Sequence, residues 1–96
     1  MDRKLIWTEK ASGDIEAIVR YIARRNPNAA ARIGAGIYER AQILLQHPDA
    51  GSILDELREG GWRKLIFRVY TIRETAIIIG RVWPAAMGEA DLETPL

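Results

Sequence analysis

The pattern of hydrophobic and polar positions is clearest between Trp62 and Trp83, where β-branched and aromatic residues predominate. Such side chains suit a pleated, half-buried surface, so the pattern predicts two long strands joined by a tight turn near residues 73–75. Residues 76–79 are apolar at consecutive positions, which indicates a strand with both faces covered. An apolar run this short also fits a buried helix, but its β-branched content and the polar turn before it favour a strand.

A helical period precedes these strands. Four apolar residues spaced at i, i+3, i+4 and i+7 predict an amphipathic helix from Glu9 to about Arg25, with Thr8 as its N-cap. Asn26 and Pro27 suit the N-cap and first position of a second helix, which we expect to end near Gln46. Its apolar stripe is Ile33, Ile37, Ala41, Leu44 and Leu45. Two helices this close in sequence form an antiparallel hairpin.

Shorter elements complete the expected order. Residues 4–8 predict a strand, residues 52–57 a short strand or extended arm, and Gly60-Gly61 a turn. The sequence thus predicts one α+β domain over residues 1–96, with an N-terminal strand and an α-helical hairpin packed on one face of a small antiparallel β-sheet. The order is β-α-α-β-β-β. Residues 84–96 form an acidic tail that we expect to be ordered only in part without a partner.

Composition narrows the possible functions. The 96 residues carry a net charge of +1, so no global field draws the chain to nucleic acid or membrane. With no Cys, disulfides and thiol chemistry are excluded, and with only one His we expect no structural zinc site. We expect no metal and no cofactor. The first residues lack a secretory signal, and no apolar run is long enough to span a bilayer, so a cytoplasmic protein is expected.

The candidate site is basic. Alternation along residues 62–72 predicts that Lys64, Arg68 and Tyr70 project from an open sheet face while Leu65 and Val69 face the core. Such a strip suits a phosphate or an acidic partner helix, and the competing interpretation is an ordinary solvated face. The expected partner-binding residues are Arg58, Lys64, Arg68, Tyr70, Arg81 and Trp83. Aromatic residues at strand ends are more often core lids than partner anchors.

No catalytic arrangement is evident. His47 adjoins a helix-ending proline, and we interpret it as a surface or loop residue. Ser12 and Ser52 have no context that would activate a nucleophile, and no carboxylate pair has a spacing typical of acid–base chemistry. The two adjacent glycines form a turn rather than a phosphate loop.

In order and spacing, the chain resembles the ParE branch of the RelE/ParE toxin superfamily over roughly residues 5–83. The residues that carry the resemblance are Trp7-Thr8, Ala11, Asp14-Ile15, Ile18, Tyr21-Ile22-Ala23, Asn26-Pro27, Ala29-Ala30, Pro48, Gly51, Glu56-Leu57-Arg58, Arg63, Leu65, Tyr70, Ile72, Ile77, Ile79 and Arg81-Val82. The resemblance implies the toxin of a bacterial type II toxin–antitoxin pair, associated with plasmid stabilisation. It also implies a first strand that lies beside the last.

ParE-branch toxins poison DNA gyrase, and RelE-branch relatives are ribosome-dependent mRNA endonucleases that use Arg, Lys and Tyr. Here Arg81-Val82 is followed by Trp83-Pro84-Ala85-Ala86-Met87 in place of the usual basic tail. The basic residue and tyrosine of the nuclease tail are missing, so we expect no enzymatic activity. The resemblance places this tail near the surface that these toxins use, so the missing basic residues also count against gyrase poisoning.

The resemblance therefore leaves three hypotheses. The first is a gyrase poison neutralised by a ParD-like antitoxin, with no membrane contact and no specific DNA binding of its own. The second is an mRNA endonuclease that uses Arg63, Lys64, Arg68 and Tyr70. The third is a degenerate toxin that only binds its antitoxin.

Overall fold

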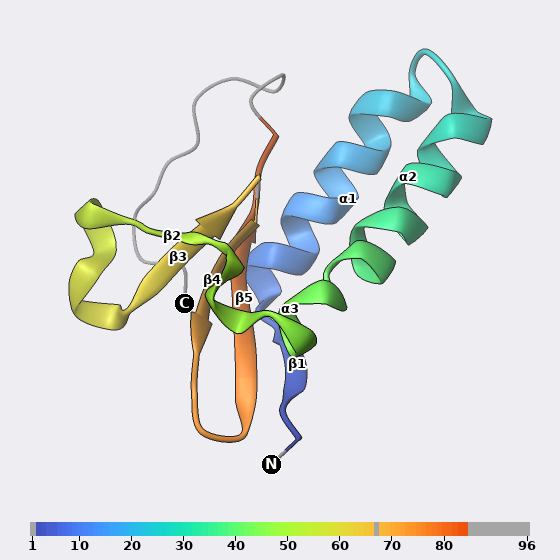
Figure 1. Ribbon diagram of the computed structural model, residues 1–96. Helices are drawn as coiled ribbons and strands as arrows, with labels where there is room; N and C mark the ends of the chain where they lie inside the picture. The colour runs from blue at the N-terminus through green and yellow to red at the C-terminus, as the bar shows by residue number, and fades with distance from the viewer. Residues whose placement is uncertain (1, 67, 85–96) are drawn as a thin grey trace.

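The computed structural model describes residues 2–66 and 68–84, and Figure 1 shows a helical hairpin beside a twisted sheet. The sequence predicts a partly ordered acidic tail over residues 84–96, and residues 85–96 lie outside the described part of the chain. In chain order the elements are β1 (Lys4–Trp7), α1 (Glu9–Ala23), α2 (Pro27–Arg40), α3 (Ile43–Gln46), η1 (Pro48–Ala50), β2 (Ser52–Ile53), η2 (Asp55–Gly60), β3 (Trp62–Leu65), β4 (Arg68–Ile72) and β5 (Ala76–Val82).

Both long helices begin where the sequence predicts, at side-chain caps. The Thr8 hydroxyl accepts a hydrogen bond from the Ala11 N–H at 3.1 Å, and Asn26 Oδ1 accepts one from the Ala29 N–H at 3.1 Å. Each cap satisfies a first-turn donor that has no partner within its helix. Figure 1 shows α1 beside the sheet and α2 on its outer side, so α1 forms the main contact between the two layers.

The second helix is interrupted before Gln46. After Arg40 the chain turns at residues 41–42 and resumes as α3. The N–H groups of Gln42, Leu44 and Leu45 bond to carbonyls three residues earlier, which is the tighter 3₁₀ pattern. Leu44 is nevertheless buried, so the predicted apolar stripe still reaches the core through this break.

The sheet has five strands in the order β1-β5-β4-β3-β2. β1 runs parallel to β5, with Lys4 opposite Ala76 and Trp7 opposite Ile79, and every other neighbouring pair is antiparallel. The α+β class and the helical hairpin are confirmed. The sheet is mixed rather than antiparallel, because a parallel pair needs a crossover connection and the helical hairpin begins that connection.

The predicted strand over residues 62–72 is two strands. β3 ends at Leu65, which pairs with Arg68 at the start of β4, so the chain reverses between them. Ile66 begins the reversal with φ = 59° and is 72% exposed. A positive φ in a β-branched residue is a real exception to backbone preferences, and no sequence rule signals it.

The reversal changes which residues share a face. Tyr70, Ile77, Ile79 and Val82 pack into the core with the helices. On the other face Trp62, Val69 and Thr71 are also buried. The Thr71 hydroxyl donates to the Gly60 carbonyl at 2.8 Å, so the end of η2 lies against this face. The predicted open face is therefore covered at these three positions.

Candidate functional site

Arg68 and Tyr70 are buried rather than projecting from an open face. Arg68 is 3% exposed and Tyr70 is 0% exposed. The face assignment was wrong for both because the turn after Leu65 places Arg63 opposite Tyr70 and Lys64 opposite Val69. Lys64 is exposed, as expected, but it lies on the opposite face from Arg68 and Tyr70. The predicted cationic strip does not exist as one surface.

Tyr70 anchors the segment after α3, residues 48–51, to the sheet. Its hydroxyl donates to the Pro48 carbonyl at 2.7 Å and accepts from the Gly51 N–H at 2.8 Å. Burial raises the pKa of Tyr70 above its usual 10.0, against smaller opposing effects of the Gly51 hydrogen bond and the charge of Arg63. The phenol is therefore held as a protonated hydrogen-bonding group.

Arg63 anchors the same segment from the neighbouring strand. Its Nη1 donates to the Gly51 carbonyl at 2.8 Å and, more weakly, to the Asp49 carbonyl at 3.5 Å. Because Arg63 lies directly opposite Tyr70, the two side chains hold residues 48–51 from adjacent strands. Tyr70 and Arg63 thus both hydrogen-bond the backbone of their own chain.

Arg68 joins the sheet to the outer helix. Its Nη2 donates to the Ile37 carbonyl in α2 at 3.1 Å. Burial, followed by the positive charge of Arg40, lowers the pKa of Arg68 below its usual value. A guanidinium in this position stabilises the contact between β4 and α2 and adds positive charge beneath the surface of α2.

Arg81 and Trp83 come together at the end of β5. The Arg81 guanidinium lies 5.8 Å from the centroid of the Trp83 ring, within the range of a cation–π interaction. Arg81 also pairs with Asp14 of α1, and these two side chains are 15% and 8% exposed. Arg81 is thus largely a structural residue, and Trp83 packs beside it.

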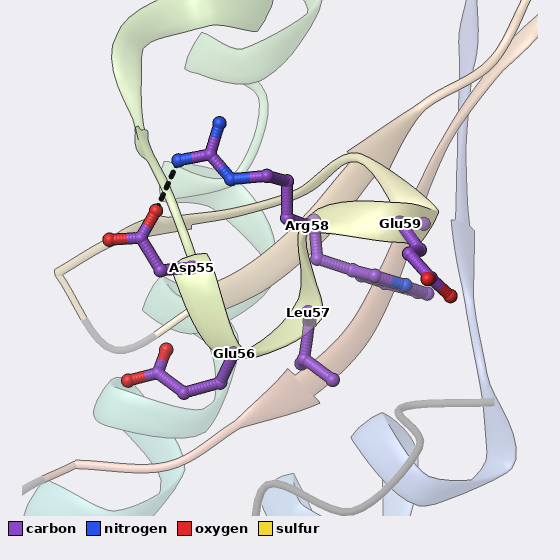
Figure 2. A pocket seen from close by; sticks show the side chains of 7 residues that line it. Asp55, Glu56, Leu57, Arg58 and Glu59 are labelled. Carbon is purple, nitrogen blue, oxygen red and sulfur yellow. Dashed lines mark hydrogen bonds and ion pairs between the residues drawn. The ribbon is translucent and has the colours of Figure 1, made fainter.

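Arg58 lies apart from the others, on η2. Figure 2 shows its side chain reaching back to Asp55, with which it forms an ion pair at the protein surface. Residues 55–60 and Trp62 line a hollow of about 480 Å³ here. Three of its lining side chains are acidic, so this hollow does not suit an anion. The six expected partner-binding residues therefore do not form one surface, and their binding role stays a prediction.

A second hollow, of about 200 Å³, was not predicted. It lies between α2 and β4 and is lined by Arg32, Ile33, Gly36, Ile37, Arg40 and Arg68. We call it the arginine hollow. The signal was present in the sequence, because Arg32, Gly36 and Arg40 recur at intervals of four and so share one helix face.

Residues 2–66 and 68–84 contain no helix with the length and apolar character needed to cross a bilayer. Within the same ranges, no three His, Asp or Glu side chains are grouped as metal ligands.

The fold places a helical hairpin after the first strand and then brings that strand beside the last, as in the small α+β toxins that the sequence resembles. The family model for the ParE toxin of type II toxin–antitoxin systems, parDE, matches residues 5–88, and the chain belongs to this family. Among solved structures, a chain of the chromosomal ParDE TA system from P. aeruginosa superposes with a TM-score of 0.69. The match has 24% identity and covers 83% of this chain and 92% of that chain, which shows a shared fold. The comparison with curated proteins gave no match.

Proposed function

We propose that this ParE-family toxin acts in the cytoplasm by binding and poisoning DNA gyrase, without catalysis, and that a ParD-like antitoxin neutralises it. The observation that supports the proposal is that Tyr70, Arg68 and Arg63 have structural roles. Each of these side chains hydrogen-bonds the backbone of its own chain.

Cleaving RNA without a metal needs a base for the 2′-hydroxyl, a donor for the leaving oxygen and cations on the phosphate. Of the four residues that the nuclease hypothesis names, only Lys64 is exposed. Tyr70 is fully buried, and its raised pKa makes its phenol a poor base near neutral pH. These facts favour a toxin that acts by contact.

A contact mechanism needs surface for partners. Exposed apolar side chains occur along α2 and α3, at Ile33, Tyr38 and Ile43, and on β1 at Ile6. Apolar and aromatic side chains of this kind form the centres of protein interfaces, surrounded by polar residues. The solved structure with the same fold belongs to a ParDE system, which supports an antitoxin as one partner.

A supercoiling assay with purified gyrase tests the proposal. We expect micromolar toxin to inhibit supercoiling and to trap cleaved DNA, and a ParD-like antitoxin to restore gyrase activity. Glu16→Gln is a suitable control variant, because it alters only an exposed, 4.0 Å ion pair on α1 and should inhibit like the wild type.

Two results would contradict the proposal. One is undisturbed gyrase at micromolar toxin in cells that still stop growing. The other is codon-phased cuts, seen by primer extension on translated messages after induction. Normal growth without the antitoxin would instead support the degenerate toxin.

A further inference from the structure

We propose that the arginine hollow binds a carboxylate side chain of an acidic, amphipathic peptide segment. The inference rests on the proposed function, in which the antitoxin supplies that segment.

The outer side of the hollow carries two arginines of α2. Arg32 and Arg40 are exposed, and among the described residues no carboxylate pairs with either. Burial lowers the pKa of Arg68, and the positive charge of Arg40 lowers it further, so the two guanidinium groups repel each other. Three like charges around one hollow repel each other, and an anion placed between them relieves that repulsion.

The geometry leaves room for a side chain. Arg32, Gly36 and Arg40 lie on one face of α2, with the glycine one turn from each arginine. A Cβ added at Gly36 would meet no atom within 4 Å. Arg68 is held beneath by the Ile37 carbonyl at 3.1 Å. A carboxylate entering over Gly36 would therefore meet cations on several sides.

The lining favours a peptide over nucleic acid. Ile33 is 42% exposed beside the cations, and an amphipathic helix could cover it while its carboxylate reaches the guanidinium groups. A planar carboxylate also matches the two-pronged donor geometry of arginine. A nucleic-acid strand needs a longer track of cations, and the chain as a whole carries only a net charge of +1.

Fluorescence anisotropy tests the inference. The probe is a labelled, amidated 16-residue helical peptide with Leu and Glu on one face and Ala elsewhere, and the comparison peptide has Gln in place of Glu. We expect the Glu peptide to bind the wild type about tenfold more tightly than the Gln peptide, since the ionised group adds charge-assisted hydrogen bonds.

Two glycine variants make a matched pair. Gly36→Glu places a carboxylate in the hollow, while Gly13→Glu makes the same change on α1, where an added Cβ also meets nothing within 4 Å. We expect Gly36→Glu to lose about tenfold in affinity for the Glu peptide and Gly13→Glu to stay within about twofold. Circular dichroism should show that both variants remain folded, because replacing a helical glycine favours the helix.

Equal binding of the Glu and Gln peptides would overturn the inference, as would equal binding by the two glycine variants. A 16-nucleotide single-stranded RNA that binds more tightly than the Glu peptide, and is lost in Gly36→Glu, would reassign the hollow to phosphate. Growth arrest by the wild type is measured separately. Failure to arrest growth contradicts the proposed toxin function while the peptide result stands on its own.

Discussion

Asp14 of α1 and Arg81 of β5 form a two-pronged ion pair between the helical layer and the sheet. Arg81 Nε lies 2.7 Å from Asp14 Oδ2, and its Nη2 lies 3.0 Å from Oδ1. The Val82 N–H donates to Oδ2 as well, at 3.0 Å. Three donors thus satisfy one nearly buried carboxylate, which compensates for removing it from water.

Asp14→Asn should therefore destabilise the protein strongly. The substitution keeps the shape but leaves the Arg81 charge without its counter-ion, which typically costs about 3 kcal/mol or more. Urea unfolding followed by circular dichroism measures the loss. Glu16→Gln is the matched control, and because its ion pair with Arg20 is exposed, its effect should be below about 0.5 kcal/mol. Similar midpoints for the two variants would show that the Asp14 pair contributes little.

Tyr70→Phe should destabilise the protein although it removes only one oxygen. The Gly51 N–H and the Pro48 carbonyl would lose their partner, and a buried polar group left unsatisfied costs about 1–3 kcal/mol. Tyr21→Phe is the control, because Tyr21 is exposed and its loss should cost less than about 0.5 kcal/mol. Thermal unfolding of both variants checks the difference, and an unchanged midpoint for Tyr70→Phe would contradict it.

The contribution of Tyr70 should also depend on pH. Burial raises the pKa of Tyr70 above 10.0, so the unfolded state releases this proton first as the pH rises. Its contribution to stability is complete below about pH 10 and falls as the pH rises towards the folded-state pKa. The stability difference between the wild type and Tyr70→Phe should therefore narrow above about pH 10. Denaturant titrations across this range measure it, and a constant difference would contradict the prediction.

Ile66→Gly should stabilise the protein. Ile66 has φ = 59°, a conformation that costs a residue with a Cβ about 1–2 kcal/mol and costs glycine nothing. The entropy of glycine in the unfolded chain offsets part of this, so we expect a gain of about 0.5–1 kcal/mol. Ile53→Gly is the control, since Ile53 is also exposed but lies in the extended strand β2. It should destabilise, and a loss of equal size at Ile66 would contradict the prediction.

Gly51→Ala should destabilise the protein through a close approach. An added Cβ would lie 2.7 Å from the Tyr70 hydroxyl oxygen and 2.9 Å from the Lys64 carbonyl carbon. Because one of these neighbours is backbone, we expect a cost of about 1–3 kcal/mol. Gly13→Ala has open space and should instead stabilise α1 by up to about 1 kcal/mol. Chemical denaturation compares the stabilities of the two variants. Equal effects would show that residues 48–51 can shift at little cost in free energy.

The sequence predicts this fold best where the information is local. The caps at Thr8 and Asn26 act within three residues, so both helix starts are confirmed. The turn at Ile66 has no such signal, because no Gly, Pro, Asn or Asp marks it in the sequence and pairing of β3 with β4 overrides the backbone preference of Ile66. That one reversal moved Arg68 and Tyr70 from the expected surface into the core.

The candidate site was harder to predict for a related reason. The sequence does not distinguish a basic strand residue that is exposed to solvent from one that donates to a carbonyl of another element. Arg68 is of the second kind, because it donates to the Ile37 carbonyl. Asp14 could have been found, because it stands at i+3 from Ala11 within the buried stripe of α1. A carboxylate among apolar positions implies a buried partner, although which arginine it pairs with depends on the tertiary structure.

The parallel pairing of β1 with β5 has a consequence for how this toxin is made. The first strand leaves the ribosome early, yet the strand that completes its ladder is nearly the last described segment of the chain. Long-range parallel pairing of this kind forms slowly, since much of the chain must be ordered first. A chain translated only as far as β4 therefore lacks the strand that joins β1 to the rest of the sheet, and the toxin's folded shape must wait for β5.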